Sequence, residues 1–398
     1  MKIEQEILEK IWKGNPEWLR EKRENALKIF QESNFPVWKR LKLDLNFWNG
    51  LKIDFVNLTK PGFFIKRKSS STESFIFTDI SDALKNYPDL VKESIEKIEI
   101  HDQEKKLMSL LWLLWRSGNF LFVPESSKLK EPIFSCTRAD SDIFSFNLII
   151  GKKNSEFVYL DESRARNSNK TGFRNSLTVV FLDEGAKAKL IHIQNLGEKY
   201  LNVFYGKSFL GNNSSILWNL EEIGSEISSI NVQSNLNGTN SKANLTSMFI
   251  SKQNQKIDHL YEAIHSGPGT ESSIRVKGSI FDESMAIYRA NAHIKKGARK
   301  SKVSQKGDIL LLGEKAKADA IPSLWIEEDD CQASHGASVA PLNFQKVFYM
   351  ITRGLEKREA KKLLIRGFYD SLIRNVEDDR IISRMERVIE KRLTDVQF

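Results

Sequence analysis

The spacing of hydrophobic and polar positions changes twice along the chain and divides it into three parts. In the first part, residues 1–118, apolar residues recur with helical spacing after Pro16, which suits a first helical position and follows Asn15 as a candidate N-cap. The residues on the apolar face of this segment are Leu19, Ala26, Leu27 and Phe30. Pro36 ends the pattern, so we predict a helix between Pro16 and Pro36.

Two further features of this first part predict a loop and a helix. The polar segment 66–73 predicts an exposed loop, and a second helix is predicted over 103–116 with Gly118 as its C-terminal cap. The most apolar stretch, 107–115, is far shorter than the roughly 20 residues that cross a membrane. We therefore predict a buried helix and no membrane association.

The second part, residues 119–343, contains many short runs of β-forming residues separated by Gly, Asn, Ser and Asp-Glu corners. Examples of these runs are 157–160, 176–182, 189–193, 201–205, 216–220, 245–250 and 274–280. Because no helical pattern interrupts them, the candidate architectures are a sandwich, a propeller and a solenoid.

Three features favour a parallel β-helix. Alternate positions of segment 286–292 are mostly small, which suits a narrow stacked interior, and the turn-plus-strand pieces 184–189 and 313–318 are alike. Asn237-Gly238 is the only two-residue hairpin signal of its type in this region, and coils of parallel strands do not need such hairpins. A β-sandwich remains the alternative from the pattern alone.

The third part, residues 344–398, returns to helical spacing after Pro341. Its apolar stripes are Phe344, Val347, Phe348 and Ile351; Ala360, Leu363, Leu364 and Phe368; and Ile381, Ile382, Met385, Val388 and Ile389. A small helical unit at the end of a solenoid can cap the open end, dock a partner, or do both.

Charge and cysteine content narrow the classes of function. The net charge is +9, but 61 basic residues are mixed with 52 acidic ones, and short basic runs such as Lys66-Arg67-Lys68 lack interleaved aromatic residues. We therefore expect no nucleic-acid binding. Two widely separated cysteines, Cys136 and Cys331, and a polar first segment lead us to expect a protein of the reducing cytoplasm.

Motifs for nucleotide binding and for the commonest kinds of catalysis are missing. The chain has no G-x-x-x-x-G-K-[ST] loop, no G-x-G-x-x-G turn after a strand, no G-x-S-x-G elbow, no H-E-x-x-H and no C-x-x-C. We expect no catalytic residues and no nucleotide bound by this chain. Any dependence on ATP must then come from a partner.

Six histidines occur, and His335 is singled out by its neighbours, whereas the others are predicted to be packing residues. It lies four residues after Cys331, at the junction of the strands and the C-terminal helices, so in a strand both share a face with Asp329. Imidazole and thiolate bind iron and other soft or borderline metals. Such a site would supply one or two ligands and need others from another chain. The alternative is a small buried cysteine beside a turn.

The stretch 318–368 resembles the end of the β-helix in the SufB/SufD family of iron-sulfur cluster assembly proteins. The residues that match the family pattern are Ala318, Pro322, Leu324, Ile326, Asp329, Asp330, Ser334, His335, Gly336, Ala337, Val339, Phe348, Tyr349, Met350, Arg353, Gly354, Ala360, Gly367 and Phe368. Weaker resemblance covers most of the remaining chain, at 16–20, at 118–133, and at Asp258, His265 and Ser272.

The resemblance implies a mainly β protein, with a right-handed parallel β-helix between helical N- and C-terminal parts. It also implies a complex with the SufC-like ABC ATPase, docked by the C-terminal helices, and with a SufB-like subunit, at whose interface a transient iron-sulfur cluster forms. The implied metal ligand is His335, with Cys331 as a second candidate. The implied partner-binding residues are Phe344, Phe348, Tyr349, Arg353, Gly354 and Phe368.

Departures from the family pattern favour a SufD-like over a SufB-like protein. SufB proteins carry a cluster-building cysteine just before the P-x-L/I segment, where this chain has Lys315-Ala316-Lys317-Ala318, and they tend to read E-H-E-A at 334–337. Trp325 replaces the usual Glu, and Ala333 replaces the family's cysteine, two residues after Cys331.

We expect a non-catalytic scaffold. The alternatives are a homodimeric SufB-like scaffold working with SufC alone and a β-helix carbohydrate-active enzyme, for which recurring carboxylates are missing.

Overall fold

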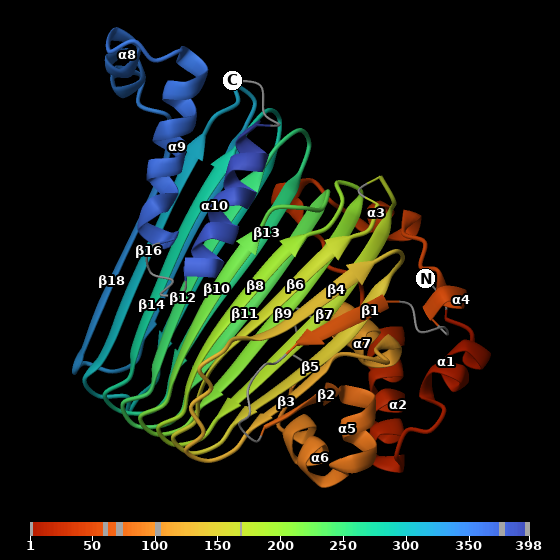
Figure 1. Ribbon diagram of the computed structural model, residues 1–398. Helices are drawn as coiled ribbons and strands as arrows, with labels where there is room; N and C mark the ends of the chain where they lie inside the picture. Colours follow the sequence, from red (N-terminus) through yellow and green to blue (C-terminus); the bar gives the residue numbers. More distant parts are fainter. Residues whose placement is uncertain are drawn as a thin grey trace.

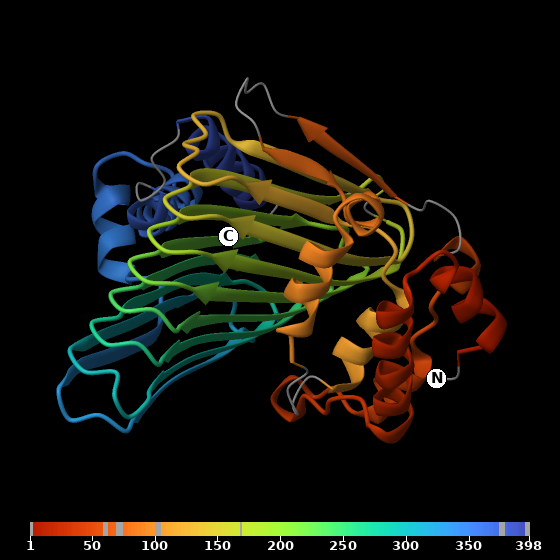
Figure 2. The ribbon, with the colours of Figure 1, turned by 90° about the horizontal axis from the view of Figure 1, so that it is seen from below.

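The computed structural model describes residues 3–58, 63–68, 75–99, 105–167, 169–373 and 379–394. Within these residues, the strands form two nine-stranded sheets, and from β3 onward strands that follow each other in the chain alternate between the sheets (Figures 1 and 2). From β3 onward, neighbouring strands of each sheet are parallel. The result is a parallel β-solenoid of about eight turns, which confirms the predicted β-helix over the sandwich.

Each turn of the solenoid gives one strand to each sheet. The even-numbered sheet consists of β4 (Ile133–Ala139), β6 (Glu156–Ala165), β8 (Lys187–Asn195), β10 (Ser215–Glu222), β12 (Lys242–Ser251), β14 (Glu271–Ile280), β16 (Ser301–Leu311) and β18 (Cys331–Pro341), with β1 (Phe63–Lys68) antiparallel at its first edge. The odd-numbered sheet consists of β3 (Asn119–Val123), β5 (Ile143–Gly151), β7 (Gly172–Leu182), β9 (Tyr200–Leu210), β11 (Ile227–Leu236), β13 (Lys256–His265), β15 (Met285–Ile294) and β17 (Lys317–Ile326), with β2 (Ile76–Asp79) antiparallel at its first edge. Every run predicted from the sequence lies inside one of these strands.

Alternate side chains of each strand fill the interior of the solenoid, and their sizes are matched between turns. The small face predicted for segment 286–292 is buried, with Tyr288 between alanines. In the even-numbered sheet, a Cβ at Gly278 of β14 would lie 2.1 Å from the ring of Phe249, its partner in register on β12. A large side chain on one turn therefore fits because its neighbour on the next turn is small, as close packing requires.

The N-terminal helices lie against the outer face of the odd-numbered sheet (Figure 2). They are α1 (Gln5–Trp12), α2 (Glu17–Glu32), the 3-10 helix η1 (Lys39–Leu41), α3 (Leu45–Gly50), α4 (Phe55–Leu58), α5 (Ile80–Asn86), α6 (Pro88–Glu96) and α7 (Lys105–Leu114). All of 107–114 is buried, and one hydrophobic cluster joins α2 and α7 to β5 and β7. No helix in the described part of the chain is both long and apolar enough to span a membrane.

Three local predictions in this part are wrong. The loop expected over 66–73 is wrong for residues 66–68, which form the end of β1 because they pair with β4, and 69–73 lie outside the described residues. Pro16 occupies the N-cap of α2, so Asn15 does not cap it. Gly118 does not cap α7, which ends at Leu114. A Cβ on Gly118 would lie 1.9 Å from the carbonyl oxygen of Phe146, so the glycine permits a close approach to β5 instead.

A buried arginine takes the capping role that was expected of Gly118. Arg23 of α2 donates hydrogen bonds to the carbonyl oxygens of Leu113 at 3.0 Å and Trp115 at 2.8 Å. These carbonyls have no partner within the helix because α7 ends there. The guanidinium therefore joins α2 to the end of α7.

The C-terminal helices are α8 (Phe344–Thr352), α9 (Lys357–Ile373) and α10 (Asp379–Thr394). Helices α9 and α10 lie on the outer face of the even-numbered sheet, whereas α8 stands away from it (Figure 1). The buried residues of α9 are Ala360, Ile365, Tyr369, Leu372 and Ile373, whereas Leu363 of the predicted apolar stripe is exposed. The hydroxyl of Tyr369 donates to the carbonyl of Phe249 at 2.8 Å, which fixes where the helix meets β12.

Candidate functional site

The last turn of the solenoid has an open edge in both sheets. Within the described part of the chain, strand β17 pairs only with β15, and β18 pairs only with β16. Unpaired N–H and C=O groups at such an edge can accept another strand. The side chains of β18 are mostly small, and from Ser334 onward all of them are exposed. This end of the molecule is therefore suited to receive a second chain.

The two predicted metal ligands lie on β18 and face the interior of the open turn. Cys331 is in register with Ser301 of β16, and His335 is in register with Gln305. Both partners on β16 are buried, so the alternation of the strand places Cys331 and His335 on the inward face, as expected. Asp329 does not share that face, because β18 begins only at Cys331 and Asp329 lies in the preceding bend.

Cys331 and His335 differ in their surroundings. Cys331 is half-buried against a small hydrophobic cluster, and its thiol donates to the carbonyl of Glu328 at 3.1 Å. Burial, followed by the negative charges of Glu328, Asp329 and Asp330, raises the pKa of this thiol. Since the thiolate is the form that binds metals, Cys331 is poorly prepared as a ligand. His335 is exposed at the open edge.

The donor set around His335 is incomplete. Among the residues that the structure describes, no three His, Cys, Asp or Glu side chains are grouped so that they could hold a metal ion. An iron-sulfur cluster is usually held by four protein ligands. His335 can therefore take part in such a site only together with ligands from elsewhere.

The predicted partner-binding residues fall into two environments. Phe344, Phe348 and Tyr349 of α8 are 74%, 57% and 58% exposed, and the two phenylalanine rings stack at 6.4 Å. Arg353 lies 5.2 Å from the centre of the Tyr349 ring, and Gly354 follows with a φ of +92°. Three large apolar rings in one exposed group are unusual on a protein surface and typical of an interaction site.

Phe368 lies apart from this group. It is half-buried between α9 and the even-numbered sheet, with the Lys277 ammonium 4.6 Å from the centre of its ring. Lys277 also donates to the carbonyl of Phe368 and to the hydroxyl of Ser371 at 2.7 Å. Phe368 therefore helps to hold α9 on the sheet, and the exposed apolar surface is formed by α8.

Most remaining histidines are packing residues, as predicted, but one belongs to a buried polar group that the sequence reasoning missed. His259 and His265 are fully buried inside the solenoid and hydrogen-bonded to neighbouring hydroxyls. His192 lies between Asp161, at 3.5 Å, and Glu222, at 3.7 Å, on three successive even-numbered strands. Burial lowers the pKa of His192 and raises that of Glu222 to about 8. His101 is outside the described residues.

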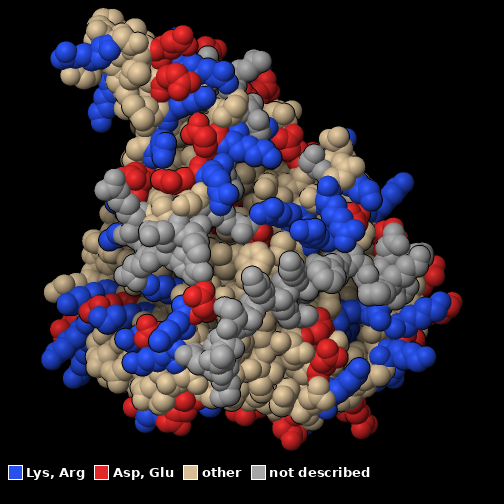
Figure 3. Space-filling model, viewed as in Figure 1, with Lys and Arg blue, Asp and Glu red and all other residues tan. Residues whose placement is uncertain are grey.

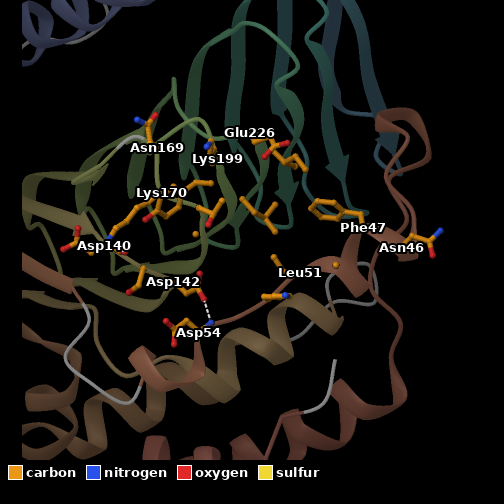
Figure 4. Close-up of a pocket in the computed structure, with 18 residues that line it drawn as sticks. Asn46, Phe47, Leu51, Asp54, Asp140, Asp142, Asn169, Lys170, Lys199 and Glu226 are labelled. Atoms are coloured by element: carbon orange, nitrogen blue, oxygen red, sulfur yellow. Dashed lines mark hydrogen bonds between the residues drawn. The ribbon is translucent and has the colours of Figure 1, made fainter.

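A pocket of about 900 Å³ lies between the segment around α3 and the corners of several turns (Figure 4). Phe47 lines it from the N-terminal segment and Lys199 from the solenoid. The carboxylate of Asp142 accepts hydrogen bonds from the backbone N–H groups of Asp54 at 2.7 Å and Phe173 at 2.8 Å, which ties the two parts together. Lysines and carboxylates are mixed around the pocket, so its charge favours neither anions nor cations. The sequence did not predict it because its walls are distant in the chain.

A family comparison and the similar proteins of known function both point to iron-sulfur cluster assembly. Residues 134–368, more than half of the chain, match the family described as SUF system FeS cluster assembly, SufBD core domain. The iron-sulfur cluster assembly protein SufD of Bacillus subtilis is 25% identical over 99% of this chain and 98% of its own length. An iron-sulfur cluster assembly SufBD family protein of Staphylococcus haemolyticus is 23% identical over 95% of this chain and 90% of its own length.

Proposed function

Because this chain belongs to the SufBD family of the SUF system of iron-sulfur cluster assembly, we propose that it is the SufD-like scaffold subunit of an assembly complex. In this proposal, it works in the cytoplasm with a SufB-like chain and a SufC-like ABC ATPase. It holds no nucleotide itself and is not an enzyme. The nascent cluster is cargo, held for a time at the contact between this chain and its partner subunit.

The open last turn is the observation that carries the proposal. His335 lies on the inward face of an edge strand, exposed and without companion ligands among the described residues of its own chain. A partner strand added to β18 brings other side chains next to His335. A cluster that forms there needs both chains, which accounts for a scaffold made of two related subunits.

Anaerobic reconstitution of the cluster on the co-expressed complex tests the role of His335. We expect His335→Ala to lower the yield of cluster, read from its visible absorption, and Cys331→Ala to leave most of it because the thiol is held protonated. His293→Ala is the matched control, since His293 pairs with Glu327 at 2.7 Å and points away from the interior of the turn. Equal yields from the His335 and His293 variants would contradict the ligand role.

The exposed rings of α8 support the docking of the ATPase. Phe344, Phe348 and Tyr349 are three exposed rings on one short helix. Single exposed apolar residues are common on protein surfaces, whereas a group of them indicates an interaction site. We expect a chain truncated before Phe344, and the milder variant Phe348→Ser, to lose retention of the SufC-like ATPase in a pull-down. Val37→Ser, which removes a side chain that is 46% exposed on the N-terminal part, is the control. Retention of the ATPase by the truncated chain would refute this docking site.

A homodimer is a second candidate for the assembly, and the composition of β18 is compatible with it. The strand carries no Asp, Glu, Lys or Arg, so two copies can meet edge to edge without repulsion between charges on the pairing strands. Sedimentation of the protein with and without a co-expressed SufB-like chain separates the two assemblies. A heterodimer that forms at the expense of the homodimer supports the first proposal.

A further inference from the structure

The outer face of the even-numbered sheet is uncovered over the first halves of its last three strands. Helix α9 contacts β12 and β14 but leaves Arg275 of β14 and Lys302 and Lys306 of β16 exposed. In Figure 3, basic side chains gather along the lower left of this face, with some acidic ones among them. This surface, defined by Arg275, Lys302, Lys306 and Gly336, is called the basic face below.

Two cations of the basic face lie next to each other on neighbouring strands. Arg275 is directly in register with Lys306, so the two side chains leave neighbouring strands that are about 4.8 Å apart. Like charges in such a pair repel each other. Within the described part of the chain, neither forms an ion pair, and Glu271, beside Lys302, is already paired with Lys242 at 2.9 Å. Among the described residues of this face, Asp308 is the one nearby carboxylate outside an ion pair, and it is in register with Lys277.

Hydroxyl groups fill the row between the cations. Ser304 lies between Lys302 and Lys306 on the outward side of β16, and it is in register with Ser334 of β18. Both serines are exposed. Lysine, arginine and serine side chains together offer charged and neutral hydrogen-bond donors, which is the chemistry that recognises carboxylates.

The fold of this chain does not require a glycine at position 336. A Cβ at Gly336 would meet no atom within 4 Å, and its φ is not in the left-handed region. By contrast, a Cβ at Gly278 would clash with Phe249, and one at Gly307 would lie 2.3 Å from the Tyr288 ring. Glycine weakens the interior of a strand and often marks a place where another backbone approaches closely. Gly336 is in register with Lys306, so the open space lies beside the cations.

We propose that the basic face binds an acidic, extended segment of a partner protein, whose backbone passes over Gly336 and whose carboxylates meet Arg275 and Lys306. A protein segment fits better than a nucleic acid for two reasons. The cations lie on two neighbouring strands, β14 and β16, which are about 4.8 Å apart. Among the described residues, no exposed large apolar side chain lies on the outward faces of β14, β16 and β18, so no aromatic ring is available there for base stacking.

Fluorescence anisotropy of a fluorescein-labelled oligoglutamate peptide with the full-length protein tests this proposal. We expect Arg275→Gln combined with Lys306→Gln to weaken binding by about tenfold and to reduce its salt dependence, as the loss of two ion pairs predicts. The control is Lys128→Gln combined with Lys187→Gln, which removes the same charge from earlier turns. Equal weakening by the control pair, or no binding to the wild type, would overturn the proposal.

Two further measurements separate the alternatives. Gly336→Val should leave the melting temperature unchanged, because its side chain enters open space, but should weaken peptide binding severalfold. Undiminished binding by this variant would overturn the close approach at Gly336. An oligothymidylate of equal charge should bind more weakly than the peptide. Tighter binding of the oligonucleotide, lost with the same two cations, would replace the acidic segment by nucleic acid.

Discussion

Replacing the buried Glu221 by glutamine should stabilise the protein above neutral pH and leave it unchanged in mild acid. Glu221 lies on the outward side of β10, two residues after Asn219, whose side chain contacts Met385 of α10. Its neighbours in register are Ile193 and Met248, which are buried apolar residues. Neither carboxylate oxygen has a hydrogen-bond partner among the described residues.

The size of the effect follows from the pKa of this carboxyl group. Burial, followed by the charge of Glu222, raises the pKa of Glu221 to about 8 from 4.5. The folded state therefore holds a proton that the unfolded state releases, so stability falls as the pH rises from 4.5 to about 8. At about 1.36 kcal/mol for each pKa unit, the full cost is about 5 kcal/mol, reached above the folded pKa. Glutamine removes this cost because it cannot ionise.

Urea denaturation at about pH 4, below the unfolded pKa, and at about pH 8.5 measures the difference. We expect Glu221→Gln to match the wild type at the lower pH and to exceed it by several kcal/mol at the higher one. Glu156→Gln, an exposed carboxyl on the same face of the sheet, is the control and should change neither. Equal pH dependence in Glu221→Gln and wild type would refute the reasoning.

Two other substitutions test local features. Gly118→Ala should lower the free energy of unfolding by about 3 kcal/mol or more, because its Cβ would lie 1.9 Å from the Phe146 carbonyl oxygen. An unchanged melting temperature would contradict this contact. Cys331 should react slowly with iodoacetamide at neutral pH and faster as the pH rises, because the pKa of its thiol is raised. Glu328→Gln should increase the rate of this reaction, because it removes one of the nearby negative charges. A fast reaction at neutral pH would show that the thiol is already ionised.

The solenoid could be predicted because its determinants are local. The alternation of small residues around Tyr288 in segment 286–292 reports which side of a strand is buried, and that information lies within a few residues. The apolar stretch 107–115 reports a buried helix in the same way. His335 and Cys331 could be placed on one face because four-residue spacing in a strand fixes their relation.

The errors and omissions depend on contacts between distant residues. Gly118 was predicted to cap a helix because only its local sequence was known. The carbonyl of Phe146, whose close approach requires the glycine, is 28 positions away in the chain. The group around His192 was missed because the register between turns depends on corner lengths that the sequence does not reveal. Helical spacing places Leu363 in an apolar stripe but does not define which side of α9 meets the sheet, and Leu363 is exposed.

The first edges of the two sheets are covered by short antiparallel strands and the last edges are open, so the parts of the solenoid form in a defined order during synthesis. The short antiparallel strands β1 and β2 and the N-terminal helices complete the first edges, and each later turn adds to a turn already formed. Domains fold from the N-terminus while the ribosome is still at work. The edge formed by β17 and β18, which can recruit another strand, is thus the last part of the β-solenoid to emerge. This pairing edge therefore forms only after the rest of the solenoid that supports it has been synthesised.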